Sequence, residues 1–493
     1  MPDRILIPLI VACALFMQNL DSTVVATALP AIAADFGSSP IHLKLALTTY
    51  LLTIAVFLPA SGWMADTFGA RLVFRVAILV FTVGSVMCGL ARSVEWLVIA
   101  RIVQGLGGAM MVPVGRLVVL RSVSKSELVA ALSWLTIPGL AGPVLGPPVG
   151  GFLTTYASWP WIFWINVPVG ILGIVLASFY IPDIREERHT NFDWVGFAQT
   201  GFGLALLMFG STTLGLNLLP LTLDFLIMAV GAALLFAYVK HTRRISDPIL
   251  NLALFRIPSF RHSIVGATIF RLGLGASPFL LPLLLQLGFG MTAFASGLIT
   301  FSSAAGALVM KFTAPLIIRL FGFKRVLIVN TLLSAVFIAL PAFFTPATPA
   351  SLMIGLLLVG GFFRSLQFTA TNALTFADVT RDEMSQATVI SSVAQQIAMS
   401  AGITVGAIVL QITVSATGGE ITASSFWPAF LAVGITTLIS VLPYARLEAD
   451  AGQEMSGHQR RGVAAAAPAA TGAAQPTPLP STGRSGAPKS LGD

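Results

Sequence analysis

The stretch Asp66-Thr67-Phe68-Gly69-Ala70-Arg71 has a counterpart in the second half of the chain, Arg319-Leu320-Phe321-Gly322-Phe323-Lys324. In both copies a charged residue is followed by a glycine three positions later and by a cation two positions after that. Each copy also separates two long apolar runs. The sequence therefore predicts an internal repeat, in which this stretch joins two consecutive helices of each copy.

Two further pairs match at nearly the same separation. The segment Val123-Ser124-Lys125-Ser126-Glu127-Leu128 corresponds to Val379-Thr380-Arg381-Asp382-Glu383-Met384, and the Gly146–Gly150 pair corresponds to the Gly402–Gly406 pair. Repeated helix bundles are typical of secondary transporters, whose substrate site lies near the membrane midplane between the repeats. A channel or a membrane enzyme can also be built as a repeat, so this observation alone leaves those classes open.

The composition indicates that these helices lie in lipid. Of the 493 residues, 56% are hydrophobic and only 10% are charged, whereas about a quarter of the residues of a soluble domain are charged. A helix needs about 20 apolar residues to cross a bilayer, and the backbone cannot stay unpaired there. Fourteen such runs begin near Ile5, Leu43, Leu72, Val94, Leu128, Ile162, Trp194, Leu221, Arg261, Ala293, Val326, Ala350, Gln386 and Ser425.

We therefore predict an all-α membrane protein with 14 transmembrane helices. Two six-helix bundles related by pseudo-two-fold symmetry are expected, with two further helices inserted between them. The predicted divisions are 1–182 for the N-terminal bundle, 183–245 for the inserted helices, 246–446 for the C-terminal bundle and 447–493 for the tail. The tail is rich in Ala, Pro, Gly, Ser and Thr, a composition that predicts a disordered cytosolic segment.

The distribution of Lys and Arg predicts the orientation. With the N-terminus in the cytosol, seventeen of them lie on the cytosolic side and two, Lys44 and Arg92, lie outside. This bias predicts that both termini are cytosolic. It also accounts for the net charge of +8, so the expected partner is the lipid bilayer and not nucleic acid, and we expect a monomer.

Neither a cofactor nor a metal site is predicted. Cys13 and Cys88 lie in apolar runs, and all five histidines fall in loops, at span ends or in the tail. No Gly-Lys dipeptide occurs, which excludes a nucleotide-binding P-loop in this chain. An ion gradient is therefore the expected source of energy.

Several motifs resemble those of one transporter family. They are Leu20-Asp21-Ser22-Thr23-Val24-Val25 in the first span, Gly62 to Arg71 after the second, Arg101-x-x-Gln104-Gly105-x-Gly107 in the fourth, Gly142 with Gly146-Pro147-Pro148-Val149-Gly150-Gly151 in the fifth, and Trp161 to Gly170 after it. Together they resemble the fourteen-helix drug:proton antiporter branch of the major facilitator superfamily. The likeness covers about residues 5–446.

The resemblance implies proton-coupled export of drugs and other small molecules across the cytoplasmic (inner) membrane by alternating access, with no enzyme activity. A dedicated exporter of organic anions such as citrate-like acids is the alternative, and a sensor or a channel would keep the fold without coupled flux. The resemblance assigns a gating role to Gly62, Asp66, Gly69 and Arg71. It assigns an antiporter motif to Gly142, Gly146, Pro147, Gly150 and Gly151.

The gating motif departs from the family pattern at two positions. Thr67 and Ala70 stand where relatives often carry basic residues. The charge contact that the resemblance implies between the second and third helices therefore lacks these two basic residues.

Asp21 is the one acidic residue deep within a predicted span. It lies about 24 Å along the first helix, at 1.5 Å per residue, and so near the middle of the membrane. An ionised carboxylate there is costly, and a carboxyl group that is neutral facing one side and charged facing the other would couple protons to transport. The alternative is a structural hydrogen-bond role beside Ser22 and Thr23.

Five cations also lie within the spans, namely Arg101, Arg116, Arg271, Lys311 and Arg364. Arginine does not lose its proton in proteins, so Arg101 is expected to pair with a carboxylate, namely Asp21. Arg116 lies close enough to the cytosolic end for its side chain to reach the interface.

The remaining three cations predict a positively charged central cavity that favours anionic or zwitterionic substrates. The alternative is that backbone carbonyls and amide side chains solvate them, with Gln395 among those amides. The predicted cavity residues are Gln104, Arg271, Gln286, Lys311, Arg364, Gln367 and Asn372.

Glycines recur on one face of the predicted fifth helix. Gly142, Gly146 and Gly150 are spaced four residues apart, so a neighbouring helix can approach closely. Pro147 and Pro148 in the same segment allow the helix to bend. A sliding contact suited to alternating access and plain tight packing both explain this pattern.

Overall fold

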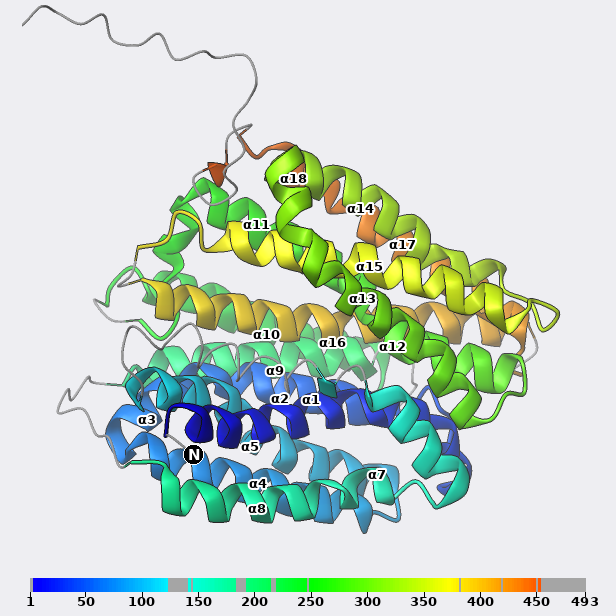
Figure 1. The fold of residues 1–493 in the computed structure, drawn as a ribbon, viewed down its shortest axis with the longest axis horizontal. Helices are drawn as coiled ribbons and strands as arrows, with labels where there is room; N and C mark the ends of the chain where they lie inside the picture. Colours follow the sequence, from blue (N-terminus) through cyan, green and yellow to red (C-terminus); the bar gives the residue numbers. More distant parts are fainter. Residues whose placement is uncertain are drawn as a thin grey trace, which may run out of the picture.

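The computed structural model describes residues 3–122, 141–142, 145–182, 192–213, 219–245, 248–380, 383–417, 420–448 and 451–453. Regular structure within these ranges is helical throughout (Figure 1). Thirteen helices there are long and apolar enough to cross a membrane. They coincide with all the predicted spans except the one near Leu128, of which residues 123–140 and 143–144 lie outside the described ranges.

The count of 14 therefore stays a prediction, although residues 145–156 of the remaining span are helical. The predicted disordered tail lies outside the described residues from 454 onward.

The first group of helices is drawn from blue to cyan in Figure 1 and forms one side of the molecule. Within it α4 packs against α5 and α8, and α2 packs against α5. The helices of this group are α1 (Asp3–Asp35), α2 (Lys44–Phe57), α3 (Ser61–Phe68), α4 (Ala70–Gly89), α5 (Val94–Ser122), the helix of residues 145–156, α7 (Trp161–Trp164) and α8 (Asn166–Tyr180).

The second group runs from green to orange and forms the opposite side (Figure 1). Within it α13 packs against α15, and α11 packs against α16 and α17. Its helices are α11 (Pro258–Gly275), α12 (Ser277–Leu283), a π-helical turn η3 (Leu284–Gly288), α13 (Ala293–Phe321), α14 (Phe323–Ala339), α15 (Ala350–Thr375), α16 (Met384–Ala416), α17 (Trp427–Ile439) and α18 (Val441–Ala445).

Two helices lie between these groups in the chain. α9 (Trp194–Thr213) and α10 (Leu221–His241) pack against each other, and α9 also contacts α2 and α16. Large apolar side chains of α10 such as Phe225, Leu226 and Phe236 are exposed, as expected for a helix that faces lipid. The division into two bundles with two inserted helices, and its boundaries, remain predictions.

The repeated loop adopts the same conformation in both copies. Gly69 has φ of 89° and precedes α4, and Gly322 has φ of 73° and precedes α14. A side chain disfavours this left-handed region of φ. The repeated stretch in the sequence therefore corresponds to a repeated turn in the structure.

The conformation of Gly69 gives a stability prediction. Replacing Gly69 with Ala should lower the free energy of unfolding by about 1 kcal/mol, because alanine must adopt a positive φ. Gly62→Ala is the matched control, since Gly62 lies in α3 and an added Cβ would meet nothing within 4 Å. Thermal unfolding of the two variants in the same detergent measures the difference, and equal melting temperatures would contradict the prediction.

Candidate functional site

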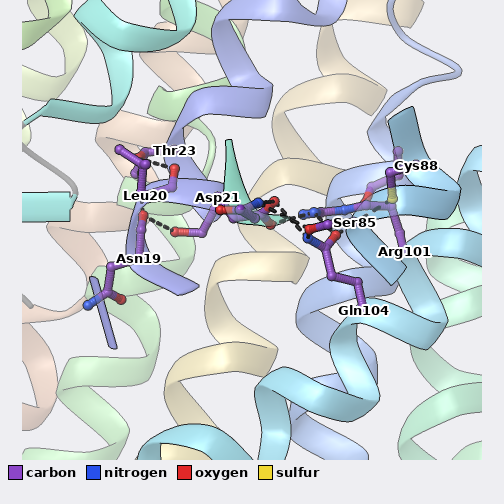
Figure 2. Close-up of polar contacts among 11 residues, drawn as sticks. Asn19, Leu20, Asp21, Thr23, Ser85, Cys88, Arg101 and Gln104 are labelled. Carbon is purple, nitrogen blue, oxygen red and sulfur yellow. Dashed lines mark hydrogen bonds and ion pairs between the residues drawn. The ribbon is translucent and has the colours of Figure 1, made fainter. Parts of the chain in front are cut away.

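The Asp21 side chain lies at the centre of a buried polar cluster on the N-terminal side of the molecule (Figure 2). Its residue is 1% exposed. The carboxylate Oδ2 accepts a hydrogen bond from Arg101 Nη1 at 2.5 Å, and Oδ1 accepts from Gln104 Nε2 at 2.8 Å and from Asn166 Nδ2 at 3.1 Å. The expected pairing of Arg101 with Asp21 is thus present as a fully buried ion pair.

A second layer of contacts fixes these partners. Ser85 Oγ accepts from Gln104 Nε2 at 2.7 Å and from Asn166 Nδ2 at 3.1 Å. Arg101 Nη1 also donates to Gln104 Oε1 at 2.6 Å, and its guanidinium lies 4.0 Å from the centroid of the Tyr50 ring. These side chains come from α1, α2, α4, α5 and α8, so the cluster ties five helices together.

Two buried polar atoms of this cluster lack a hydrogen bond to any described residue. Arg101 Nη2 and Tyr50 Oη are both buried and, within the described ranges, have no hydrogen-bond partner. Removing one member of a buried ion pair leaves the other charge uncompensated, which costs about 3–5 kcal/mol. Loss of the Asp21 charge would therefore leave Arg101 uncompensated in a buried site.

Sequence reasoning placed Gln104 in the substrate cavity, whereas the structure places it in the Asp21 cluster. It missed Ser85, Tyr50 and Asn166 as partners of Asp21 and Arg101. Asn166 lies in one of the quoted motifs as an amide among apolar residues, which is a usable signal. Serine and tyrosine are common in membrane helices, so their sequence positions gave no signal.

A cavity of about 260 Å³ lies between the two sides of the molecule. The N-terminal side contributes α1 and the helix of residues 145–156, and the C-terminal side contributes α12, α13, α14, α15 and α17. Its lining includes Thr23, Ala26 and Thr27 of α1.

Asp21 does not line this cavity. It is two residues before Thr23, which corresponds to about 200° of rotation around a helix. Figure 2 shows Asp21 directed towards Ser85, Arg101 and Gln104, on the side away from Asn19 and Thr23. The body of α1 therefore separates the acid from the cavity.

Arg364 of α15 is the one charged side chain among the described residues that line the cavity. The side chain of Lys311 lies outside what the structure describes.

The remaining predicted cavity residues lie elsewhere. Arg271 is 1% exposed and donates from Nη2 to Asn372 Oδ1 at 3.0 Å, so an amide solvates it. Gln367 Nε2 donates to Thr331 Oγ1 at 2.9 Å in a buried contact. Gln286 Nε2 donates to the carbonyl of Thr27 at 2.9 Å.

The glycines of the antiporter motif pack directly on α1, the helix that carries Asp21. A Cβ added at any of the three would collide with α1, Gly142 at Asn19 and Leu20, Gly146 at Thr23, and Gly150 at Thr27 and Val24. The expectation of a close helix contact is therefore confirmed, and α1 is the neighbour.

The same helix touches the C-terminal side of the molecule. A Cβ at Gly151 would collide with Ala293 and Phe294, at the start of α13. The helix of residues 145–156 thus lies between α1 and the opposite group.

In the gating motif, Arg71 Nη2 donates to the carbonyl of Ser178 near the end of α8. A cation at a helix C-terminus is favourable because carbonyls there carry partial negative charge. Asp66 is half-buried in the last turn of α3, and Gly62 is exposed. Their gating role remains a prediction.

The model of the Major Facilitator Superfamily matches residues 11–253 and 263–479. This chain is a member of that superfamily. Among major facilitator proteins it is 38% identical over 452 residues to the "Putative multidrug resistance protein MdtD" of Salmonella heidelberg (strain SL476), covering 90% of this chain and 95% of that relative. It is also 38% identical over 462 residues to the protein of the same name from Escherichia coli (strain SE11), covering 92% and 96%.

Solved structures of low sequence identity share the major facilitator fold. The nucleoside transporter NupG superposes with a TM-score of 0.63 at 12% identity, over 89% of this chain and 99% of that one. A bacterial homologue of the human lysosomal transporter Spinster, in an inward-facing and unoccupied conformation, gives 0.62 at 15% identity, over 90% and 96%. Together with the family match, these comparisons identify the chain as a multi-pass membrane transporter with the major facilitator fold, in which the regular structure of the described residues is helical.

Proposed function

We propose that this transporter exports small molecules from the cytosol in exchange for protons, by alternating access across the cytoplasmic membrane, with both termini cytosolic and as a monomer. The observation that carries the proposal is the position of Asp21 on one face of α1 while the opposite face lines the cavity between the two sides of the molecule. The relatives named for multidrug resistance support a small-molecule cargo.

Protonation of Asp21 would act on α1. The ionised carboxylate holds α1 to α5 through Arg101 and Gln104, and to α8 through Asn166. A neutral carboxyl group binds these donors less strongly than a carboxylate does. If these hydrogen bonds weakened, α1 could shift. Because α1 forms part of the cavity wall, this shift would change the cavity.

The movement would pass to the opposite side through two contacts. Gln286 donates to the carbonyl of Thr27, and Phe294 N donates to Thr155 Oγ1 at 3.0 Å. The first contact joins Thr27, about two turns before the end of α1, to the C-terminal group, and the second joins Thr155, at the end of the fifth helix, to the same group. Both lie towards the outer side in the predicted topology. These bonds would break when that side opens.

Purified protein in liposomes tests the coupling. A pH difference of one unit supplies about 1.4 kcal/mol per proton, so one-for-one exchange should sustain about a tenfold concentration ratio of a transported substrate. A proton ionophore should abolish that ratio. A concentration ratio that persists with the ionophore present would contradict the proposal. So would the failure of the protein, without the ionophore, to build up a concentration ratio of any cationic, neutral or anionic candidate.

The second candidate, an exporter of organic anions, is favoured by one observation. Arg364 is the charged residue in the described cavity lining, and a cation in that position attracts anions. The charge preference of that cavity therefore distinguishes an exporter of varied small molecules from an exporter of organic anions.

A further inference from the structure

The described lining of the cavity between the two sides carries one positive charge and no negative charge. Its described lining is apolar and hydroxyl-bearing apart from Arg364, and contains no Asp or Glu. Arg364 is half-buried and, across the described ranges, forms no hydrogen bond or ion pair. Its five N–H donors are thus available to a bound molecule.

The other two arginines deep in the spans differ from Arg364 in this respect. Arg101 pairs with Asp21 at 2.5 Å, and Arg271 donates to Asn372 and lies 5.1 Å from the centroid of the Phe368 ring. A charge inside an apolar site is costly unless it is paired. Arg364 is therefore the cation whose pairing a ligand would complete.

We propose that the cavity binds amphiphilic monoanions, molecules with one carboxylate or sulfonate on an apolar body, with the acid group at Arg364. The inference rests on the proposed function in taking this cavity as the cargo site. The apolar body would contact side chains such as Leu281, Phe337 and Phe430, and the hydroxyls of Ser277 and Ser303 can donate to the acid group.

The same lining disfavours the other charge classes. An organic cation would meet Arg364 with like charge and find no carboxylate in the described lining. A zwitterion would leave its cation unpaired for the same reason. A citrate-like acid carries more negative charges than one arginine can pair, and the excess would be desolvated against apolar walls.

Two bicyclic probes of similar size and opposite charge test this inference by binding to the full chain in detergent. Naphthalene-1-sulfonate is the anion and N-methylquinolinium is the cation, with citrate as a third ligand. Wild type should bind the sulfonate about tenfold or more tightly than either other probe, because the quinolinium cannot form the charge-assisted bond to Arg364 and citrate must desolvate charges that Arg364 cannot pair.

Substitutions at Arg364 should change this order. Arg364→Gln should weaken sulfonate binding about tenfold or more, Arg364→Lys should retain part of it, and Arg364→Glu should favour the quinolinium. Arg116→Gln is the matched control, because Arg116 is another intramembrane arginine, exposed and outside the cavity lining. Elution and melting profiles equal to wild type establish that each variant is folded.

The outcomes separate this inference from proton coupling. The monoanion site would be overturned if wild type did not bind the sulfonate or preferred the quinolinium. It would also be overturned if folded Arg364→Gln bound the sulfonate as tightly as wild type does. Arg364-dependent binding of the sulfonate, without its movement under a pH gradient in liposomes, would support the site and contradict the proposed antiport.

Discussion

Replacing Asp21 with Asn is expected to abolish pH-driven transport while substrate-for-substrate exchange continues in the absence of a gradient. The Asn oxygen can still accept from Gln104 or Asn166, but the side chain cannot take up or release a proton. The concentration ratio sustained by one pH unit should therefore fall from about tenfold to one. Measuring both modes in the same liposomes separates lost coupling from lost transport.

Asp35→Asn is the control for this substitution. Asp35 is on the same helix, is exposed, and accepts a hydrogen bond from Trp159 Nε1 at 3.0 Å, which an amide oxygen can also do. It should transport like wild type. Full pH-driven accumulation by Asp21→Asn would refute the assignment.

The Asp21→Asn variant should also be less stable than wild type, because Arg101 loses its counter-charge in a buried site. The double variant Asp21→Asn with Arg101→Gln removes both charges. It should recover much of the lost melting temperature without recovering coupling. Recovery of both would show that Asp21 contributes structure alone.

Gly146→Leu should eliminate transport in both the gradient-driven and the exchange modes. A side chain at this position would occupy the space of the Thr23 hydroxyl, so α1 and the fifth helix must separate. Overpacking of this kind costs typically about 1–3 kcal/mol. It would also displace Thr23, a residue of the cavity wall. Initial rates of exchange in liposomes measure the effect.

Gly355→Leu is the matched control for Gly146→Leu. Gly355 is an exposed glycine of α15, and an added Cβ would meet nothing within 4 Å. This variant should exchange substrate at the rate of wild type. If Gly146→Leu also exchanged substrate at the wild-type rate, close contact between the fifth helix and α1 would not be needed for transport.

The predictable part of this molecule follows from composition and spacing. Long apolar runs predicted thirteen of the observed helices, because hydrocarbon forces the backbone to pair within each run. The spacing of Gly142, Gly146 and Gly150 predicted a close helix contact. A lone acid and an arginine, both costly in lipid, predicted the pairing of Asp21 with Arg101.

What could not be predicted is the rotation of each helix about its own axis. Nearly uniform hydrophobicity gives little amphipathic signal. The sequence therefore could not indicate that Asp21 and Thr23 face opposite ways, or that Arg364 lines the cavity while Arg271 is paired with Asn372. Gln104 was misplaced for the same reason, since its helix presents it to Asp21.

The most direct test of the central claim is to follow protons while the substrate gradient supplies the energy. Liposomes are loaded with whichever bicyclic probe wild type carries and with a pH-sensitive dye, and the membrane potential is clamped with potassium and valinomycin. As the probe leaves by wild-type protein, the lumen should acidify, and Asp21→Asn should release probe without acidification. Probe efflux by wild type with no change in luminal pH, or equal acidification by Asp21→Asn, would contradict proton exchange at Asp21.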